Sequence, residues 1–283
     1  MRAVTQGGRT GSALLHAQSR CTRAFHLEQP RSDVIRGNTL RIPRIFTPQA
    51  LVTDKRLTIT GQSAHHVTHV LRLRTGASIR IFDGQGCEHQ ARLTDITRSG
   101  ITLDIREPVV AIPESPLQLT LLQGIARNDR MDFILQKAVE LGVQTIQPIW
   151  MQRSQTRLKG ERLEKRISHW QGVITSACEQ SGRSTLPQLS LPEDYLTWIN
   201  TGTDNDLRLM LQPDARSCLR NLEKPTGGIS ILVGPEGGLA PEEQTLARTA
   251  GFTGIRLGPR ILRTETAALA TLAGIQALWG DFS

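Results

Sequence analysis

Apolar and polar residues alternate along several short segments in the first part of the chain. The alternation has a period of two residues, which is typical of half-buried β-strands, and it covers residues 56–60, 78–82, 89–96 and 101–106. Between the first two segments, Val67, Val70 and Leu71 have helical spacing, and order begins near residues 40–46. The pattern predicts a small, mostly β barrel with one helix over residues 40–112.

The pattern of apolar and polar residues changes after residues 106–116, a stretch with three prolines that we interpret as a linker. Strands and helices then alternate. Strands are predicted at 117–125, 143–150, 207–211, 229–233 and 254–258, and helices at 130–142, 160–180, 241–251 and 264–279. Such alternation predicts an α/β fold for residues 113–283, with a mostly parallel sheet covered on both faces.

Residues 1–39 show neither the helical nor the strand periodicity and are rich in Arg, Gly, Ser and Gln. We predict a disordered extension. Because it is Arg-rich and has no acidic residue before Glu28, it also faintly resembles an organellar transit peptide. We therefore expect a cytoplasmic protein, with an organellar location as the alternative.

Charge and cysteine content narrow the class of protein. The net charge is +8, and all of the excess lies in the first 112 residues. This favours a polyanionic partner for the N-terminal part, although a solvated basic surface is equally consistent. Four distant cysteines argue against a disulfide framework or a cysteine zinc site, and no apolar run approaches the roughly 20 residues that span a bilayer. We expect no membrane and no metal.

Two glycine-bearing turns follow predicted strands near the C-terminus. They are "LVGPEGG" (232–238) and "RLGPRILRTET" (256–266). Ligands of parallel sheets bind beyond the carboxyl ends of the strands. The first turn lacks the Lys-Ser or Lys-Thr of a P-loop and the spacing of a dinucleotide fingerprint. An acid-rich helix start follows it, so the turn suits a ligand without phosphate, held by backbone groups against apolar walls.

These paired turns resemble the cofactor motifs of the SPOUT methyltransferases, which carry a C-terminal trefoil knot. Together with "RIPRIF", "HHVTHVLR", "IFDGQG", "MDFILQKAVELGV" and "ACEQSGR", in this order, they make the chain similar to the bacterial 16S rRNA (uracil-N3)-methyltransferases of the RsmE type, from Leu40 onward. The resemblance implies a PUA-like RNA-binding barrel at 40–112 and a SPOUT-type α/β knot at 113–283. It also implies S-adenosylmethionine as cofactor, 16S rRNA of the small ribosomal subunit as partner, and a homodimer. The family's first methionine aligns with Leu40, so we also expect that translation can begin there.

The resemblance assigns candidate site residues. The expected cofactor contacts are Leu211, Leu232, Val233, Gly234, Pro235, Gly237, Gly238, Leu257, Gly258, Ile261, Leu262 and Thr266. Arg263 and Glu236 are the catalytic candidates. The alternative interpretation is that each caps a helix, Arg263 through a salt bridge to Glu265. The expected RNA contacts are Arg41, Arg44, Arg72, Arg74, Arg80, Arg127, Arg130 and Arg183. Glu179 and Gln180 belong to a matching motif, and Thr264 is expected to cap a helix.

Two other functions stay open at this stage. A relative in the same superfamily can methylate a ribose 2′-hydroxyl or a guanine, and a non-catalytic RNA-binding or ribosome-assembly factor would need no intact glycine turn. The intact turns and the small N-terminal barrel favour the uracil enzyme. The sequence does not identify the general base or the target nucleotide.

Overall fold

The structure is a computed structural model that describes residues 42–155, 157–201 and 205–282. The predicted extension at 1–39 and the candidate Arg41 lie outside the described residues. Within the described residues, no helix is long and apolar enough to cross a membrane. Cys178 and Cys218 are free thiols.

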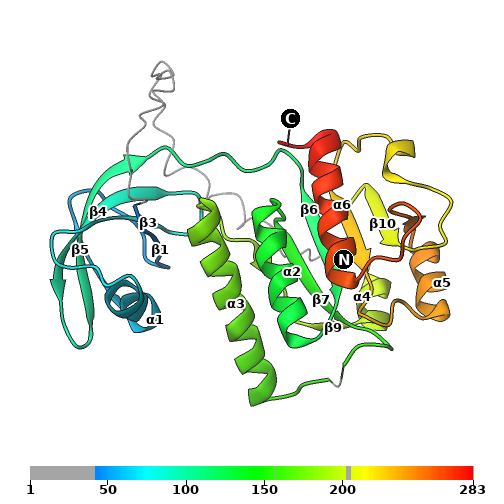
Figure 1. The fold of residues 1–283 in the computed structure, drawn as a ribbon, viewed down its shortest axis with the longest axis horizontal. Coiled ribbons are helices and arrows are strands. Elements are labelled where there is room, and N and C mark those ends of the chain that lie inside the picture. The colour runs from blue at the N-terminus through cyan, green and yellow to red at the C-terminus, as the bar shows by residue number, and fades with distance from the viewer. Residues whose placement is uncertain (1–41, 156, 202–204, 283) are drawn as a thin grey trace, which may run out of the picture. The chain divides into compact units, whose positions relative to one another are not determined.

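The first part of the chain forms a curled five-stranded sheet with a short helix (Figure 1). Its strands are β1 (Arg44–Phe46), β2 (Arg56–Thr60), β3 (Ser78–Phe82), β4 (Glu88–Ile96) and β5 (Gly100–Val109), in the order β1-β3-β4-β5-β2. Leu57 and Ile59 alternate inward from β2, as the pattern predicts, and pack in the same apolar core as Leu103 of β5. Helix α1 (Gly61–His65) continues into a π-helical turn, His66–Val70, whose Val67 is buried.

The predicted linker is shorter than expected, because β5 runs on to Val109. Its last residues pair with β4, with His89 opposite Pro108 and Glu88 opposite Val109. The ladder is irregular here, with a register shift between His89 and Ala91, and proline is tolerated at such interruptions because one lost donor costs little there. The prolines therefore mark the end of a strand as well as the linker.

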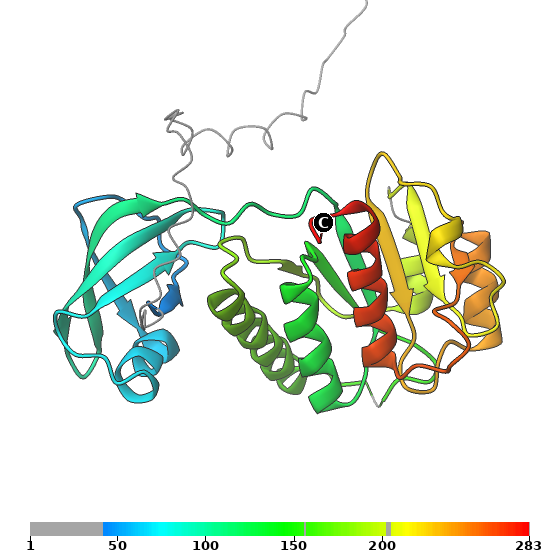
Figure 2. The same cartoon turned by 45° about the horizontal axis from the view of Figure 1, so that its top comes forward.

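The second part is built on a parallel seven-stranded sheet (Figures 1 and 2). The strands are β6 (Leu119–Gly124), β7 (Thr145–Trp150), β8 (Gln188–Leu189), β9 (Glu193–Asp194), β10 (Leu207–Leu211), β11 (Ile229–Val233) and β12 (Thr253–Ile255). The order is β12-β10-β11-β6-β7-β8, and β9 also pairs with β7. Since β6 lies between β7 and β11, segments far apart in the sequence meet at the centre of the sheet.

Helices cover both faces of this sheet, as predicted. One face carries α2 (Asn128–Glu140), α3 (Glu161–Ser181) and α6 (Thr264–Trp279), and the other carries α4 (Tyr195–Thr201) and α5 (Pro241–Thr249) (Figure 1). Neighbouring strand residues point to opposite faces, so Leu121 joins the core under α2 and α6, while Leu122 packs with Trp198 and Phe252. Both faces are therefore apolar.

Five short elements were absent from the sequence prediction. They are β1, β8, β9, α4 and the 3₁₀ turn Leu219–Asn221. Helix α4 has a helical signal, because Tyr195, Trp198 and Ile199 are spaced at i, i+3 and i+4 and are all buried. The segment spans only seven residues, too few for the periodicity to stand out.

Candidate functional site

The carboxyl ends of β10, β11 and β12 surround a cavity of about 380 Å³. Both glycine-bearing turns form its walls. The predicted cofactor residues that line it are Leu211, Val233, Gly234, Pro235, Gly237, Gly238, Leu257, Gly258, Ile261 and Leu262. The cavity thus joins exposed backbone from the glycines to apolar side chains, and its volume is in the range of small-ligand pockets.

Two predicted cofactor residues do not line the cavity. Leu232 is fully buried in the core on the opposite face of β11 from Val233, because neighbouring strand residues alternate. Thr266 is exposed on α6, whereas Thr264 and Ala267, about one turn apart, face the cavity. The side chains of Leu232 and Thr266 therefore do not face the cavity.

The first turn is packed so closely that glycine is required at two positions. A Cβ added at Gly234 would lie 2.9 Å from the backbone of both Gly238 and Leu239. A Cβ added at Gly124, the last residue of β6, would lie 2.6 Å from Pro235. The turn folds back on itself and sits directly against the neighbouring strand, so its bare backbone is a packing requirement as well as a surface of the cavity.

A buried threonine connects the two turns. The Thr264 hydroxyl donates a hydrogen bond of 2.6 Å to the Gly234 carbonyl oxygen and accepts one of 3.1 Å from Gln123 Nε2. Thr264 begins α6 without capping it through its side chain, so the expected N-cap role is replaced by this contact. The position of the second turn is thereby tied to the exit of β11.

Glu236 lies at the mouth of the cavity and connects the first turn to α2. Its Oε1 accepts a hydrogen bond of 2.8 Å from the Arg127 backbone N–H and lies 3.6 Å from Arg130 Nη1. These contacts give Glu236 a visible role in holding the turn.

Arginines surround the cavity more densely than the sequence suggested. The five that line it are Arg130, Arg153, Arg256, Arg260 and Arg263. Arg153 follows β7 and donates a hydrogen bond of 2.8 Å to the Gly237 carbonyl oxygen. Arg153, Arg256 and Arg260 were not among the predicted site residues, although Arg256 and Arg260 lie within the second glycine-bearing turn. Among the described residues, no ion pair joins Arg263 to Glu265, and Arg263 is exposed.

Comparisons with known proteins agree with this geometry. A family model described as an RNA methyltransferase domain matches residues 113–276, and one described as an RNA methyltransferase PUA domain matches residues 59–106. The ribosomal RNA small subunit methyltransferase E of Buchnera aphidicola is 32% identical over 86% of this chain and 96% of its own length. The chain belongs to this methyltransferase family.

Solved structures of the family support the same fold. The enzyme of that name from Neisseria gonorrhoeae, bound to S-adenosyl methionine, is 40% identical with a TM-score of 0.80, covering 86% of this chain and 100% of that one. A methyltransferase from Legionella pneumophila in complex with the same cofactor is 32% identical with a TM-score of 0.83, over 86% and 100%. The prediction of a SPOUT-type α/β knot with a PUA-like domain is confirmed.

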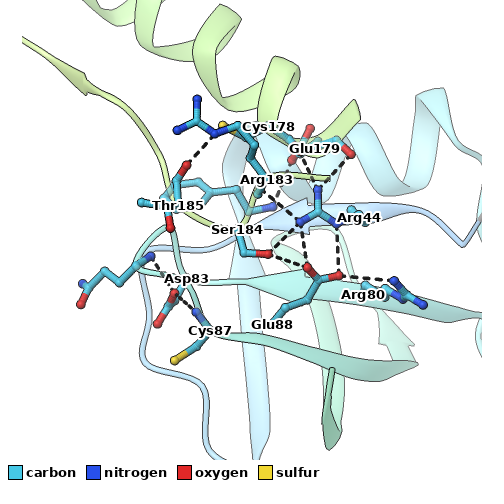
Figure 3. Close-up of polar contacts among 12 residues, drawn as sticks. Arg44, Arg80, Asp83, Cys87, Glu88, Cys178, Glu179, Arg183, Ser184 and Thr185 are labelled. Carbon is cyan, nitrogen blue, oxygen red and sulfur yellow. Dashed lines mark hydrogen bonds and ion pairs between the residues drawn. The ribbon is translucent and has the colours of Figure 1, made fainter. Parts of the chain in front are cut away.

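Two arginines predicted to contact RNA are instead buried where the small PUA-like domain meets the methyltransferase domain (Figure 3). Arg44 pairs with Glu88, and only 9% of its side chain is exposed. Arg183 pairs with Glu114 and donates to the carbonyl oxygens of Val139 and Val143. Since their donors are occupied inside the protein, the phosphate-contact assignments of Arg44 and Arg183 are wrong.

The remaining arginines of the small domain differ in accessibility. Arg72 and Arg74 are exposed after the π-helical turn. Arg80 is half-buried and lies 3.8 Å from Glu88. Glu179, from the "ACEQSGR" motif, accepts a hydrogen bond of 3.0 Å from the Phe46 backbone N–H. Arg72 and Arg74 are therefore the better candidates for an RNA-facing surface of this domain.

The carboxyl of Glu88 should make the stability of the protein depend on pH. Burial raises its pKa, but hydrogen bonds from Arg44 and Ser184 and the charges of Arg44 and Arg80 outweigh this, so the pKa lies below its usual 4.5. A lowered carboxyl pKa stabilises the folded state above the unfolded pKa. That contribution is lost as the pH falls through the folded value.

We expect the wild type to lose more free energy of unfolding between about pH 6 and about pH 3 than the variant Arg44→Met/Glu88→Leu, which lacks this pair. Urea unfolding followed by tryptophan fluorescence at several pH values measures the difference. Equal losses in the two proteins would contradict the assignment. Above pH 5 the difference between them should be constant.

Proposed function

We propose that the protein transfers a methyl group from S-adenosylmethionine to N3 of one uridine in the 16S rRNA of the small ribosomal subunit. The observation that carries this proposal is the cavity built from both glycine-bearing turns at the carboxyl end of the sheet, in a chain of this methyltransferase family. Curated relatives of the chain are named ribosomal RNA small subunit methyltransferase E, and two similar solved structures hold S-adenosylmethionine.

The residues present fit S-adenosylmethionine. Gly238 and Gly258 line the cavity at positive φ, and beyond their chain neighbours no atom of the described residues lies within 4 Å of an added Cβ. Bare backbone therefore faces the space for a flat adenosine and a bent methionine chain. Leu211, Leu257 and Leu262 supply apolar walls. When bound, the sulfonium supplies an activated methyl group, and neither a metal nor an acid is required for it to leave. Among the described residues, no cluster of three or more His, Cys, Asp or Glu is arranged to hold a metal ion.

The uracil base requires more from the protein. Its N3 carries a proton, and its lone pair is delocalised between two carbonyl groups. Loss of that proton places negative charge on the two uracil oxygens, and this charge is neutralised as the N3–methyl bond forms and the methyl–sulfur bond breaks. We propose that Arg263, exposed at the cavity and without an ion pair to Glu265, donates hydrogen bonds to these oxygens.

For Glu236, the contacts favour a positioning role over that of proton acceptor. Its carboxylate already receives the Arg127 backbone N–H and faces Arg130. By holding Pro235 and Gly237 on either side of it, Glu236 keeps the turn in the shape that the ligand needs. We propose that water or a group of the bound small subunit accepts the N3 proton instead.

We propose that RNA phosphates contact two groups of arginines. The first group, Arg72 and Arg74, is exposed on the small domain. In the second group, Arg130, Arg153, Arg256 and Arg260 line the cavity, and the exposed Arg127 lies beside them, joined through its backbone to Glu236. Phosphate contacts set the register of a folded RNA, and the base is selected by the shape of the cavity.

The assembly state and location are part of the same proposal. We infer a homodimer in the bacterial cytoplasm, where small subunits assemble. Within one chain, Ala268, Leu272 and Ile275 of α6 are already buried in the core, whereas Leu278 and Phe282 are 45% and 52% exposed. A sedimentation mass equal to one chain at micromolar concentration would count against the dimer.

The test combines the purified protein with methyl-labelled S-adenosylmethionine and small ribosomal subunits that lack the modification. We expect label in 3-methyluridine, identified by mass spectrometry of nucleosides from the digested 16S rRNA. Label in a ribose-methylated nucleoside or a methylguanosine would overturn the proposed base and keep the methyltransferase activity. Cofactor binding without any transfer would favour the RNA-binding alternative.

A further inference from the structure

One arginine of the small domain reaches into the methyltransferase domain and contacts four polar groups of a single segment there (Figure 3). Arg44 lies at the start of β1, and the segment that it meets is the end of α3 with the residues that follow. We call Arg44, Glu88, Ser184 and the carbonyl groups of Cys178, Glu179 and Arg183 the arginine clasp. It contains three of the seven residues of the "ACEQSGR" motif.

All donor atoms of Arg44 are occupied in the clasp. Toward Glu88, Nε and Nη2 lie 3.1 and 2.8 Å from the two carboxylate oxygens. Toward the methyltransferase domain, Nη1 donates to the carbonyl oxygens of Cys178 at 2.6 Å and Glu179 at 3.3 Å. Nη2 also contacts the Arg183 carbonyl oxygen and the Ser184 hydroxyl, each at 3.1 Å. The guanidinium plane therefore has one allowed direction relative to both domains.

Further contacts surround the clasp. The Ser184 hydroxyl donates to Glu88 at 2.6 Å, and the guanidinium lies 4.6 Å from the Phe82 ring centre. Backbone hydrogen bonds join Gly86 N–H to the Ser184 carbonyl at 3.1 Å and Leu186 N–H to the Gly84 carbonyl at 3.0 Å. Phe82 itself belongs to the apolar core of the methyltransferase domain.

Stability alone does not account for such an arrangement. Replacing a buried ion pair by apolar side chains of similar volume is often neutral or stabilising, because desolvation offsets most of the attraction. Phe82 and its neighbours already supply apolar contact here. The planar guanidinium instead fixes an orientation, because its N–H donors can reach a carboxylate and several carbonyl groups in only one geometry. A lysine ammonium has no such planar set of donors.

We propose that Arg44 is a positioning residue that fixes the orientation of the small domain on the methyltransferase domain. RNA held by Arg72 and Arg74 then presents its target base to the cavity in one geometry. The expected effect of Arg44 on turnover rests on the proposed function. The expected effect of Arg44 on the orientation of the domains rests on the clasp contacts alone. A displacement of about 1 Å between reacting groups can lower a rate about 100-fold, so a loose domain should affect turnover strongly.

The test uses Arg44→Lys, which keeps the charge and removes the fork. We expect its kcat on small subunits to fall about 10- to 100-fold, with the Kd for S-adenosylmethionine and the KM for RNA within about threefold of wild type. The variant Arg44→Met/Glu88→Leu should show the same loss of kcat with its melting temperature preserved. A role in stability alone would instead lower the melting temperature and leave kcat at a permissive temperature unchanged.

A second readout is independent of activity. Spin labels carried by noncanonical residues at the exposed positions Arg98 and Gln171 report the distance between the domains. We expect a narrow distance distribution in the wild type and a broad one in both clasp variants. The matched control is Arg56→Lys, which alters an exposed ion pair with Asp104 in the same domain and should change neither quantity.

A narrow distribution together with wild-type kcat in Arg44→Lys would overturn the proposal. If the wild type methylates another nucleoside, the proposed target base is wrong. The kcat of the wild type and of Arg44→Lys is then compared on that other substrate, and this comparison still tests the role of the clasp. If the wild type shows no transfer, the distance distributions decide the clasp by themselves.

Discussion

Gly234→Ala should lose most of its affinity for S-adenosylmethionine. The added methyl group would lie 2.9 Å from the backbone of Gly238 and Leu239, so the two ends of the first turn must separate. Gly234 also presents the carbonyl that receives the Thr264 hydroxyl, so the second turn should shift as well. Overpacking of this kind costs about 1–3 kcal/mol, which corresponds to a loss of roughly 10- to 100-fold in affinity. Isothermal titration calorimetry measures it.

The control for this variant is Gly172→Ala in α3. No atom lies within 4 Å of the Cβ added there, and alanine is the better helix former by about 1 kcal/mol. This variant should bind the cofactor as the wild type does and be slightly more stable. Wild-type affinity in Gly234→Ala would show that the cofactor does not depend on the packed form of the turn.

Arg263→Met should lower turnover with little effect on cofactor binding. Arg263 lines the cavity one residue before Thr264, whose buried hydrogen bonds fix the local backbone. If its guanidinium stabilises the charge on the uracil oxygens, its removal should lower kcat by about 100- to 1000-fold, as for other donors to developing anions. Single-turnover kinetics with saturating cofactor and small subunits measures this step.

The comparison variant is Arg220→Met, an exposed arginine of the same domain that does not line the cavity. It removes the same charge from the same domain, so unchanged turnover there separates a local effect from net charge. A loss in Arg263→Met confined to the KM for RNA would assign Arg263 to phosphate binding instead. Equal turnover in both variants would exclude it from the chemistry.

Local patterns predicted most elements, because their signals lie within a few residues. The strand at 229–233 and the helix at 264–279 have the predicted bounds, since a run of buried, mostly apolar residues and a long apolar stretch with helical spacing are each sufficient. The errors lie where local signals are weak. Helix α4 is too short for periodicity, and β5 passes through Pro108 because pairing with β4 compensates for the lost donor.

The candidate site was predicted as turns but not as individual contacts. Both turns line one cavity, as the resemblance implied, because parallel strands present their carboxyl ends at one edge. Leu232 and Arg44 show the limit of such reasoning. A strand residue one position away faces the other side of the sheet, and an arginine in a basic domain has no local mark of burial.

The sequence by itself determined the order of strands and helices, the two glycine-bearing turns and the family to which they belong. These properties depend on residues close together in the chain. Only the tertiary structure decided that Arg44 pairs with Glu88 and contacts the end of α3, which lies more than 130 residues from Arg44 in the sequence. It also decided that the Thr264 hydroxyl bonds to the Gly234 carbonyl group. Such contacts depend on how distant segments pack, and an arginine or a threonine has the same local pattern whether its partner is solvent, RNA or a buried carbonyl group.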